Sequence, residues 1–225
     1  MSQELLIVGA GGHGREVAWL AEDIGTFDSL GFIDENLTVG SSVGGLKVLG
    51  GNSAIRNYPQ AQYVVAIGDL RSRRLVVEKL TSMYPARRFA TLVHPSVISA
   101  KTASIGEGSM VCAGAILSVN TIIGKHVIVN MKSAVGHEVN VGDFCTLGPA
   151  SIVCGNVDLS AGVEIAAGAV VRQGLKLGHG SMAAMGSVVM KDVPANAMVL
   201  GNPARPIQQL PEFPFFFSKE NRPRE

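Results

Sequence analysis

One pair of neighbouring side chains in this sequence has the chemistry of a general base. Glu138 directly follows His137, within a stretch that reads Ala-Val-Gly-His-Glu-Val. An imidazole can take up a proton near neutral pH, and a carboxylate beside it would orient the ring and raise its basicity. A single surface histidine is more often inert, so the pair by itself leaves both interpretations open.

A glycine-rich loop near the N-terminus has the spacing of a phosphate-binding turn. Gly9, Gly11 and Gly14 match the pattern G-x-G-x-x-G, directly after an apolar run at 5–8 and at the start of a helical stretch. Bare backbone N–H groups and the positive end of a helix attract phosphate at such a place. Asp34 lies 20 residues beyond Gly14, where an acidic residue commonly binds a ribose hydroxyl.

The segment around this loop is too short for a dinucleotide dehydrogenase. About ninety residues supply half of a doubly wound sheet, which is enough for one nucleotide. A tight turn without any ligand is the alternative, and a nucleotide-linked ligand is the interpretation that we favour. Glu35 and Asp69 are further acids suited to hydroxyl groups, and Arg71 is suited to phosphate.

The His137–Glu138 pair lies inside a repeat that defines the second part of the chain. From residue 105 to residue 189 every sixth residue is Ile, Leu or Val, with one Ala. A period of six fits neither an α-helix nor a flat strand, but it is typical of a left-handed parallel β-helix built from hexapeptide repeats. Each unit would form one side of a triangular coil and point its aliphatic residue at the axis. The positions are Ile105, Val111, Leu117, Ile123, Val129, Val135, Val141, Leu147, Val153, Leu159, Ile165, Val171, Leu177, Ala183 and Val189.

Glycines follow the same period in two slots. The first slot comes directly after an aliphatic position, where we expect the backbone to turn a corner. It holds Gly106, Gly124, Gly136, Gly142, Gly148 and Gly178. The second slot holds Gly108, Gly114, Gly162, Gly168, Gly174, Gly180 and Gly186.

Histidines within the repeat raise the question of a metal, because some left-handed β-helices are zinc enzymes. His126, His137 and His179 are not separated from one another by whole coils, so no two of them would stack on one vertical line. The three cysteines are likewise not separated by whole coils, so no two of them would stack on one vertical line either. Ligands from a neighbouring subunit could still complete a site, but we expect no metal.

The sequence divides into three parts. Residues 1–93 alternate apolar strands with helical stretches, which indicates an α/β Rossmann-like half-domain with a parallel sheet. Its expected strands cover 5–8, 31–33 and 63–67, and a helix is expected from Arg15 to about Ile24. Residues 94–203, entered through His94-Pro95, form the β-helix. Residues 204–225 form a tail whose aromatic residues we expect to pack on this chain or on a neighbouring subunit: Phe213, Phe215, Phe216 and Phe217.

The composition narrows the classes of partner. A net charge of +1 and 16% charged residues give no electrostatic case for nucleic acid or for an acidic membrane surface. No apolar run approaches the roughly 20 residues of a membrane helix. Three cysteines cannot all pair, and no signal peptide is recognised before Leu5, so we expect reduced thiols in a cytoplasmic protein.

Taken together, these features resemble the bacterial sugar acyltransferases of the sialic-acid O-acetyltransferase type. That family includes acetyl-CoA-dependent N-acetyltransferases of nucleotide-linked 4-amino sugars used in surface glycans. The resemblance covers residues 5–207. It rests on Gly9-Ala10-Gly11-Gly12-His13-Gly14, Phe32-Ile33-Asp34-Glu35, Ala66-Ile67-Gly68-Asp69, His94-Pro95, Gly136-His137-Glu138 and Gly201-Asn202-Pro203-Ala204.

The resemblance implies a homotrimer with acetyl-CoA in a groove between adjacent β-helices. His137 would be the general base for the attacking sugar amine or hydroxyl, and Glu138 would raise its basicity. The acetyl-CoA groove would be lined by Thr146, Gly155, Ala167 and Met185. The nucleotide sugar would be held by Gly11, Gly12, His13, Asp34, Glu35, Gly68 and Arg71. Two positions depart from the family: some relatives carry histidine where this chain has Thr146, and Val139 replaces a frequent cysteine.

The function that the sequence favours is therefore an acetyl-CoA-dependent N-acetyltransferase acting on a nucleotide-linked 4-amino sugar. An amine that attacks a thioester needs a base and an oxyanion donor, but neither a metal nor a covalent intermediate. A sugar or sialic acid O-acetyltransferase is the first alternative, since His137 suits a hydroxyl equally well. A non-catalytic trimer that binds nucleotide sugar is the second. The acceptor, the nucleotide and the oxyanion donor are left open by the sequence.

Overall fold

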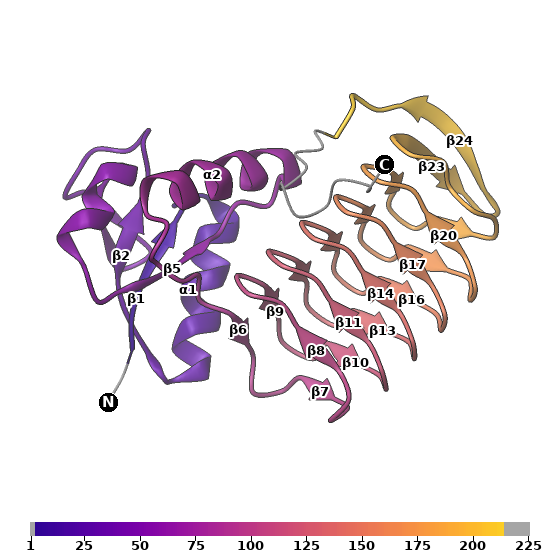
Figure 1. Ribbon diagram of the computed structural model, residues 1–225, viewed down its shortest axis with the longest axis horizontal. Coiled ribbons are helices and arrows are strands. Elements are labelled where there is room, and N and C mark those ends of the chain that lie inside the picture. The colour runs from indigo at the N-terminus through magenta and orange to yellow at the C-terminus, as the bar shows by residue number, and fades with distance from the viewer. Residues whose placement is uncertain (1–2, 214–225) are drawn as a thin grey trace, which may run out of the picture.

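The molecule has two parts, an α/β half-domain and a column of stacked coils (Figure 1). The computed structural model describes residues 3–213. The half-domain contains β1 (Gln3–Val8), α1 (Gly12–Ile24), β2 (Phe27–Ile33), β3 (Ser42–Val43), β4 (Leu46–Gly50), the 3-10 helix η1 (Asn52–Asn57), β5 (Gln62–Val65) and α2 (Leu70–Met83). Its strands form one sheet in the order β3-β4-β2-β1-β5, parallel except for β3 at the edge.

The strand expected at 5–8 is confirmed, and it is buried on both faces. Leu5 and Ile7 belong to the apolar cluster that includes residues of α1, whereas Leu6 and Val8 belong to the cluster that includes residues of α2. All four side chains are at most 3% exposed. Because alternate residues of a strand point to opposite faces, a continuous apolar run is what a sheet covered on both sides requires.

The helix α1 begins earlier than expected, at Gly12 rather than Arg15. The reason is that the glycine loop itself enters the helix: the Arg15 N–H donates to the Gly11 carbonyl at 3.1 Å. Gly14 must be glycine there, since a Cβ would overlap the Gly9 carbonyl oxygen. The free N–H groups of the first helical turn consequently lie at the loop.

The column has three walls of short strands, named here after one strand of each. The β13 wall contains β7 (Ile98–Ser99), β10 (Ile116–Leu117), β13 (Ala134–Val135), β16 (Ile152–Val153), β19 (Val170–Val171) and β22 (Val188–Val189). The β14 wall contains β8 (Ser104–Ile105), β11 (Ile122–Ile123), β14 (Asn140–Val141), β17 (Asp158–Leu159) and β20 (Lys176–Leu177). The β15 wall contains β6 (Leu92–Val93), β9 (Met110–Val111), β12 (Ile128–Val129), β15 (Thr146–Leu147), β18 (Glu164–Ile165), β21 (Met182–Ala183), β23 (Ala197–Gly201) and β24 (Ala204–Gln209).

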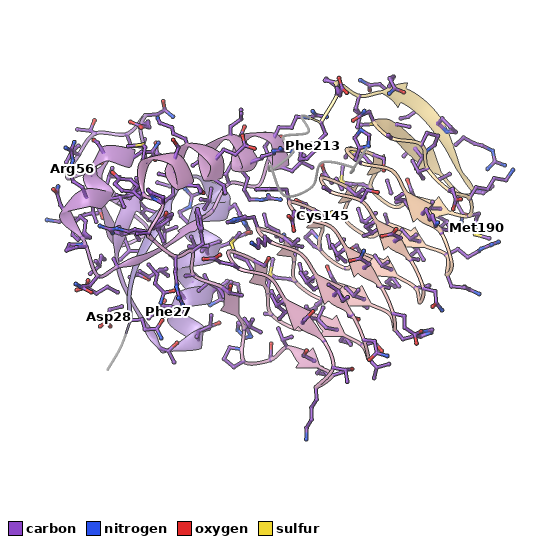
Figure 2. All side chains as sticks on the ribbon, viewed as in Figure 1. Phe27, Asp28, Arg56, Cys145, Met190 and Phe213 are labelled. Carbon is purple, nitrogen blue, oxygen red and sulfur yellow. The ribbon has the colours of Figure 1, made fainter. Side chains whose placement is uncertain are left out.

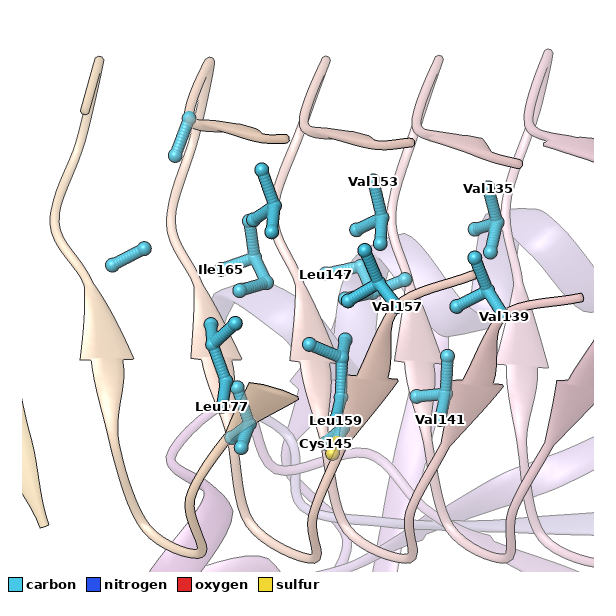
Figure 3. Packing of buried hydrophobic residues seen from close by; sticks show 14 of the residues in the cluster. Val135, Val139, Val141, Cys145, Leu147, Val153, Val157, Leu159, Ile165 and Leu177 are labelled. Atoms are coloured by element: carbon cyan, nitrogen blue, oxygen red, sulfur yellow. The ribbon is translucent and has the colours of Figure 1, made fainter. Parts of the chain in front are cut away.

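The predicted parallel β-helix and its aliphatic core are confirmed. Fourteen of the fifteen aliphatic positions belong to one buried cluster, and Ile105 on the first coil packs against it while remaining partly exposed. Figure 3 shows part of this cluster, with side chains from successive coils stacked along the axis. Leu147, Leu159 and Ile165 have no exposed surface. The core is thus a continuous stack that no single coil could bury by itself.

The two glycine slots have different physical roles, which corrects the expectation for the first slot. Residues of the second slot turn the corners: every sixth residue from 108 to 186 has a positive φ, whether it is glycine or, like Glu138 (φ 55°), another residue. The first-slot glycines lie outside that region. They allow adjacent coils to approach closely, as at Gly136, where a Cβ would lie 2.7 Å from the Gly155 backbone nitrogen.

The column extends slightly beyond both boundaries expected for it. At its start, Leu92 of β6 already pairs with Met110 of β9, and His94 ties this entry to the half-domain because its Nε2 lies 3.0 Å from the Asp23 carboxylate. At its end, β24 pairs antiparallel with β23 and continues the β15 wall as far as Gln209. The β23–β24 hairpin does not follow the six-residue period, so the period could not predict that the β15 wall continues to Gln209.

The expectation that the aromatic residues of the C-terminal tail pack on the protein is confirmed for one of the four. Phe213 is 1% exposed and packs on this same chain. Phe215, Phe216 and Phe217 lie outside the described residues. Between residues 3 and 213, none of the helices combines the length and the apolar character needed to cross a bilayer.

Candidate active site

The His137–Glu138 pair lies at the corner where the β13 wall turns into the β14 wall. His137 Nδ1 is 2.6 Å from Glu138 Oε2, and both side chains are about half exposed, at 54% and 52%. With the carboxylate ionised, Nδ1–H donates to it and the lone pair of Nε2 is left as an acceptor. The pair therefore presents a proton-accepting nitrogen on the outside of the column.

The backbone of the neighbouring coils holds this corner in place. The Glu138 N–H donates to the Val119 carbonyl at 3.0 Å, and the Asn156 N–H donates to the His137 carbonyl at 2.9 Å. Gly155 lies directly against the imidazole, because a Cβ there would overlap Nε2 and Cε1 and lie 2.8 Å from Cδ2. The ring thus rests on a residue that has no side chain to push it aside.

The four residues expected along the acetyl-CoA groove lie on different edges of a single column. Gly155 adjoins His137 at the corner between the β13 and β14 walls. Ala167 and Met185 follow β18 and β21, at the opposite edge of the β13 wall, and Met185 is 73% exposed. Thr146 starts β15 on the third wall, where its hydroxyl accepts a hydrogen bond from Arg73. One chain alone does not bring these four together.

The wall between those two corners is apolar on its outer side. Outward positions alternate with the inward aliphatic residues along each short strand. On the β13 wall the outward residues are Ile98, Ile116, Ala134, Ile152, Val170 and Val188. Ile98, Ile116 and Ile152 are exposed. A continuous apolar face of this kind marks a contact surface.

The glycine loop has open space in front of it. A Cβ added at Gly11, Gly12 or Gly68 would meet nothing within 4 Å. The N-cap residue of α1 is Gly11, and no side chain caps this helix end. The loop therefore leaves room for a ligand beside free N–H groups, as an anion site requires.

The two acids expected to bind hydroxyl groups are already engaged by the chain. Asp34 accepts from the Ala10 N–H at 3.0 Å and from the Asn36 N–H at 2.9 Å, which links the ends of β1 and β2. Glu35 accepts from Lys79 Nζ and from the Asn52 N–H, each at 3.3 Å. A carboxylate oxygen can accept more than one hydrogen bond, so both residues retain capacity for a hydroxyl.

His13 presents a neutral imidazole within the loop. Burial lowers its pKa, more strongly than the nearby Glu16 raises it. Nδ1 lies 3.2 Å from the Glu16 carboxylate, whereas Nε2 is buried without a hydrogen-bond partner among residues 3–213. An unpaired buried nitrogen is costly, so this atom is a natural contact for a bound polar group.

The buried residue Arg73 joins the loop region to the column, and the sequence reasoning missed it. Its guanidinium has no exposed surface, and burial lowers its pKa to about 10. Its nitrogens donate to acceptors from both parts at 2.9–3.2 Å: the carbonyls of Ile67, Gly68, His126, Phe144 and Cys145 and the hydroxyl of Thr146. The sequence does contain a signal for the burial of Arg73, because Arg73 shares one face of a helix with the apolar residues Leu70, Val77 and Leu80.

Arg71, expected to bind phosphate, is held by the C-terminal segment. Its two terminal nitrogens donate to the carbonyls of Glu212 at 2.9 Å and Pro211 at 2.7 Å. A phosphate could reach this guanidinium only in competition with those carbonyls. Over residues 3–213 the structure also contains no group of three or more His, Cys, Asp or Glu side chains arranged to hold a metal ion.

Comparison with known proteins gives concordant matches. A family model described as the PglD N-terminal domain matches residues 4–80. The chain is 32% identical over 216 residues to GDP-perosamine N-acetyltransferase from Escherichia coli O157:H7, covering 91% of this chain and 96% of that protein. The acetyltransferase domain of PglB from Neisseria gonorrhoeae FA1090, in complex with acetyl coenzyme A, superimposes with a TM-score of 0.84 at 31% identity, covering 92% of this chain and 100% of that one. PerB from Caulobacter crescentus, in complex with CoA and GDP-perosamine, gives a TM-score of 0.84 at 29% identity, covering 91% and 97%.

Proposed function

The chain belongs to the sugar acetyltransferases of the hexapeptide-repeat type, and on that premise we propose that it acetylates the amino group of a nucleotide-linked 4-amino sugar with acetyl-CoA. The similarity to GDP-perosamine N-acetyltransferase extends over 91% of the chain and includes both parts of the molecule. The observation that carries the proposal is the His137–Glu138 pair, whose Nε2 is left as an acceptor on an exposed corner.

The chemistry follows from that pair. His137 Nε2 takes a proton from the sugar amine as the amine nitrogen attacks the thioester carbonyl carbon. The C–N bond forms, the C–S bond breaks, and the imidazolium returns the proton to the departing CoA sulfur. Glu138 holds the ring through Nδ1, so that Nε2 keeps its orientation through both transfers.

The nucleotide sugar is assigned to the loop side of the half-domain. The diphosphate would lie against the free N–H groups at Gly11 and Gly12, where the space is open. His13 Nε2 would donate to or accept from the bound group, and Asp34, Glu35 and Gly68 would surround the nucleoside. Since Arg71 is held by the carbonyls of residues 211 and 212, we assign it a secondary role at the phosphate.

The proposed assembly is a homotrimer with acetyl-CoA between adjacent columns. The apolar β13 wall supports this, because it lies between the corner with His137 and the corner with Ala167 and Met185. If that wall is buried against its copies, one corner of each chain approaches the other corner of the next. Gly155, Ala167 and Met185 would then line a groove that no single chain contains, whereas Thr146 stays on the β15 wall with its hydroxyl bonded to Arg73.

The reaction is assigned to the cytoplasm, where acetyl-CoA and nucleotide sugars are available. Within the described residues, Cys112, Cys145 and Cys154 are all free thiols, which suits a reducing compartment.

The proposal is tested by following thiol release from acetyl-CoA with GDP-, UDP- and dTDP-linked 4-amino sugars. We expect turnover with at least one of these three, and much less with free sialic acid. Equal or faster turnover with sialic acid would favour O-acetylation instead. No thiol release with any acceptor, although nucleotide sugar binds, would favour a non-catalytic binding protein.

A further inference from the structure

The chain segment after β24, residues 210–213, crosses from the column to α2. It is anchored on Asn196: the Leu210 N–H donates to the Asn196 carbonyl at 2.6 Å, and the Phe213 N–H donates to its Oδ1 at 3.0 Å. Figure 2 labels Phe213 between α2 and the stacked coils. With 1% exposure, its ring is among the largest fully buried side chains of the molecule.

Phe213 lies along a corner of the column at which two earlier coils carry aromatic rings. At the corner between the β14 and β15 walls, the ring of His126 stacks on Phe144 with a centroid distance of 5.1 Å. The next two residues of this corner are Gly162 and Gly180. A Cβ at Gly162 would lie 2.6 Å from the Phe213 ring, and a Cβ at Gly180 would lie 2.6 Å from Phe213 Cβ, so Phe213 occupies the space that side chains at these two positions would need.

The ring of Phe213 also lies close to two arginines at the start of α2. The guanidinium of Arg74 lies 5.0 Å from the ring centroid, and that of Arg71 lies 5.9 Å from it. The carbonyls of Pro211 and Glu212 bind both terminal nitrogens of Arg71. Cation–π contacts and charge-assisted hydrogen bonds therefore fix this turn to the tail from two sides.

That turn follows Gly68 and Asp69 after β5, and Gly68 is one of the residues that we assign to the nucleoside of the nucleotide sugar. Asp69 caps α2 by accepting from the Ser72 N–H, and Gly68 precedes it. Leu210 and Pro211 also form part of a cavity of about 120 Å³ that Asp69 and Glu164 line from the other side. Residues 210 and 211 thus form one wall of the space beside Asp69 and the start of α2.

We propose that residues 210–213 are a positioning element for the nucleotide-sugar half of the site, with Phe213 as the residue that holds the first turn of α2 against the column. This inference rests on the proposed function. Phe213 acts through Arg71 and Arg74 and does not contact the reacting atoms. Without it, the turn loses its support on one side while the buried Arg73 still holds the other.

The test compares Phe213→Ala with wild type in the full-length protein. We expect KM for the GDP-linked 4-amino sugar to rise about 10-fold or more, while KM for acetyl-CoA and kcat stay within about 2-fold. Phe213→Leu keeps most of the apolar volume but has no aromatic face for the two arginines, so it should recover only part of the affinity. Ile207→Ala, which truncates an exposed residue of β24 without touching α2, is the matched control and should behave as wild type.

Hydrogen exchange of residues 68–74 gives a readout that does not depend on catalysis. We expect faster exchange there in Phe213→Ala and unchanged exchange around His137. Unchanged exchange in residues 68–74, or an equal rise of KM for both substrates, would overturn the positioning role. A wild-type protein that transfers no acetyl group would instead count against the proposed function, and the exchange experiment would still decide the role of the tail.

Discussion

Gly155→Ala is the change by which the position of His137 can be tested without altering either catalytic side chain. Gly155 lies against the imidazole, and a methyl group there would stand 2.8 Å from His137 Cδ2 and closer still to Nε2. Carbon atoms in contact prefer about 3.5–4.0 Å, so the ring must move by roughly 1 Å. A misplacement of about 1 Å can cost about 10²-fold in rate, which is the decrease in kcat that we expect.

The same substitution should leave the fold nearly unchanged. Gly155 has no positive φ, so alanine fits the backbone, and the half-exposed ring can swing outward instead of opening the coils. The assay is initial-rate thiol release, combined with CoA binding by calorimetry and a thermal melt. Gln173→Ala, one coil further along the same corner, is the control. Wild-type kcat in Gly155→Ala, or a loss explained entirely by weaker CoA binding, would refute the reasoning.

Three further predictions use the same assays and equilibrium unfolding. His137→Ala should lower kcat by about 10²-fold or more with CoA binding nearly intact, and an unchanged kcat would remove the residue from the mechanism. Burial, with the charges of Arg73 and Lys125, lowers the pKa of His126 to about 4 from its usual 6.5. As the pH falls, His126 therefore takes up a proton in the unfolded chain at a higher pH than in the folded chain. The free energy of unfolding should consequently fall by about 2 kcal/mol between pH 7 and pH 5. His126→Phe should lack this loss in urea titrations, and an equal loss in the variant would contradict the assignment. Ile152→Asp on the β13 wall should give monomers in light scattering, whereas Ile122→Asp on the β14 wall should not; trimers in both would exclude the β13 wall as the interface.

The architecture could be predicted because its stabilising pattern is local and periodic. Each hexapeptide unit repeats the same demand for one inward aliphatic residue, so fifteen positions specify the column without knowledge of any long-range contact. The strand at 5–8 was recognisable for a similar reason, since a parallel strand covered on both faces needs an uninterrupted apolar run.

What the sequence could not give are the contacts between distant segments. Arg73 bonds to His126 across 53 positions and Arg71 to Glu212 across 141. The periodicity of α2 places Arg73 on its apolar face, but no pattern identifies the carbonyls that either arginine meets. The first-slot glycines were misinterpreted for a related reason. Their requirement comes from the backbone of the next coil, as at Gly136, where a Cβ would lie 2.7 Å from the Gly155 nitrogen, and not from their own φ.

The central claim is that each reaction site combines His137 of one chain with the Ala167 edge of the next. The direct measurement is complementation between His137→Ala and Ala167→Trp, two variants that should each be inactive alone. Random trimers from an equal mixture should recover about one quarter of the wild-type activity, because one in four sites then pairs an intact His137 with an intact Ala167. A mixture that exchanges subunits and stays inactive would contradict a site shared between chains.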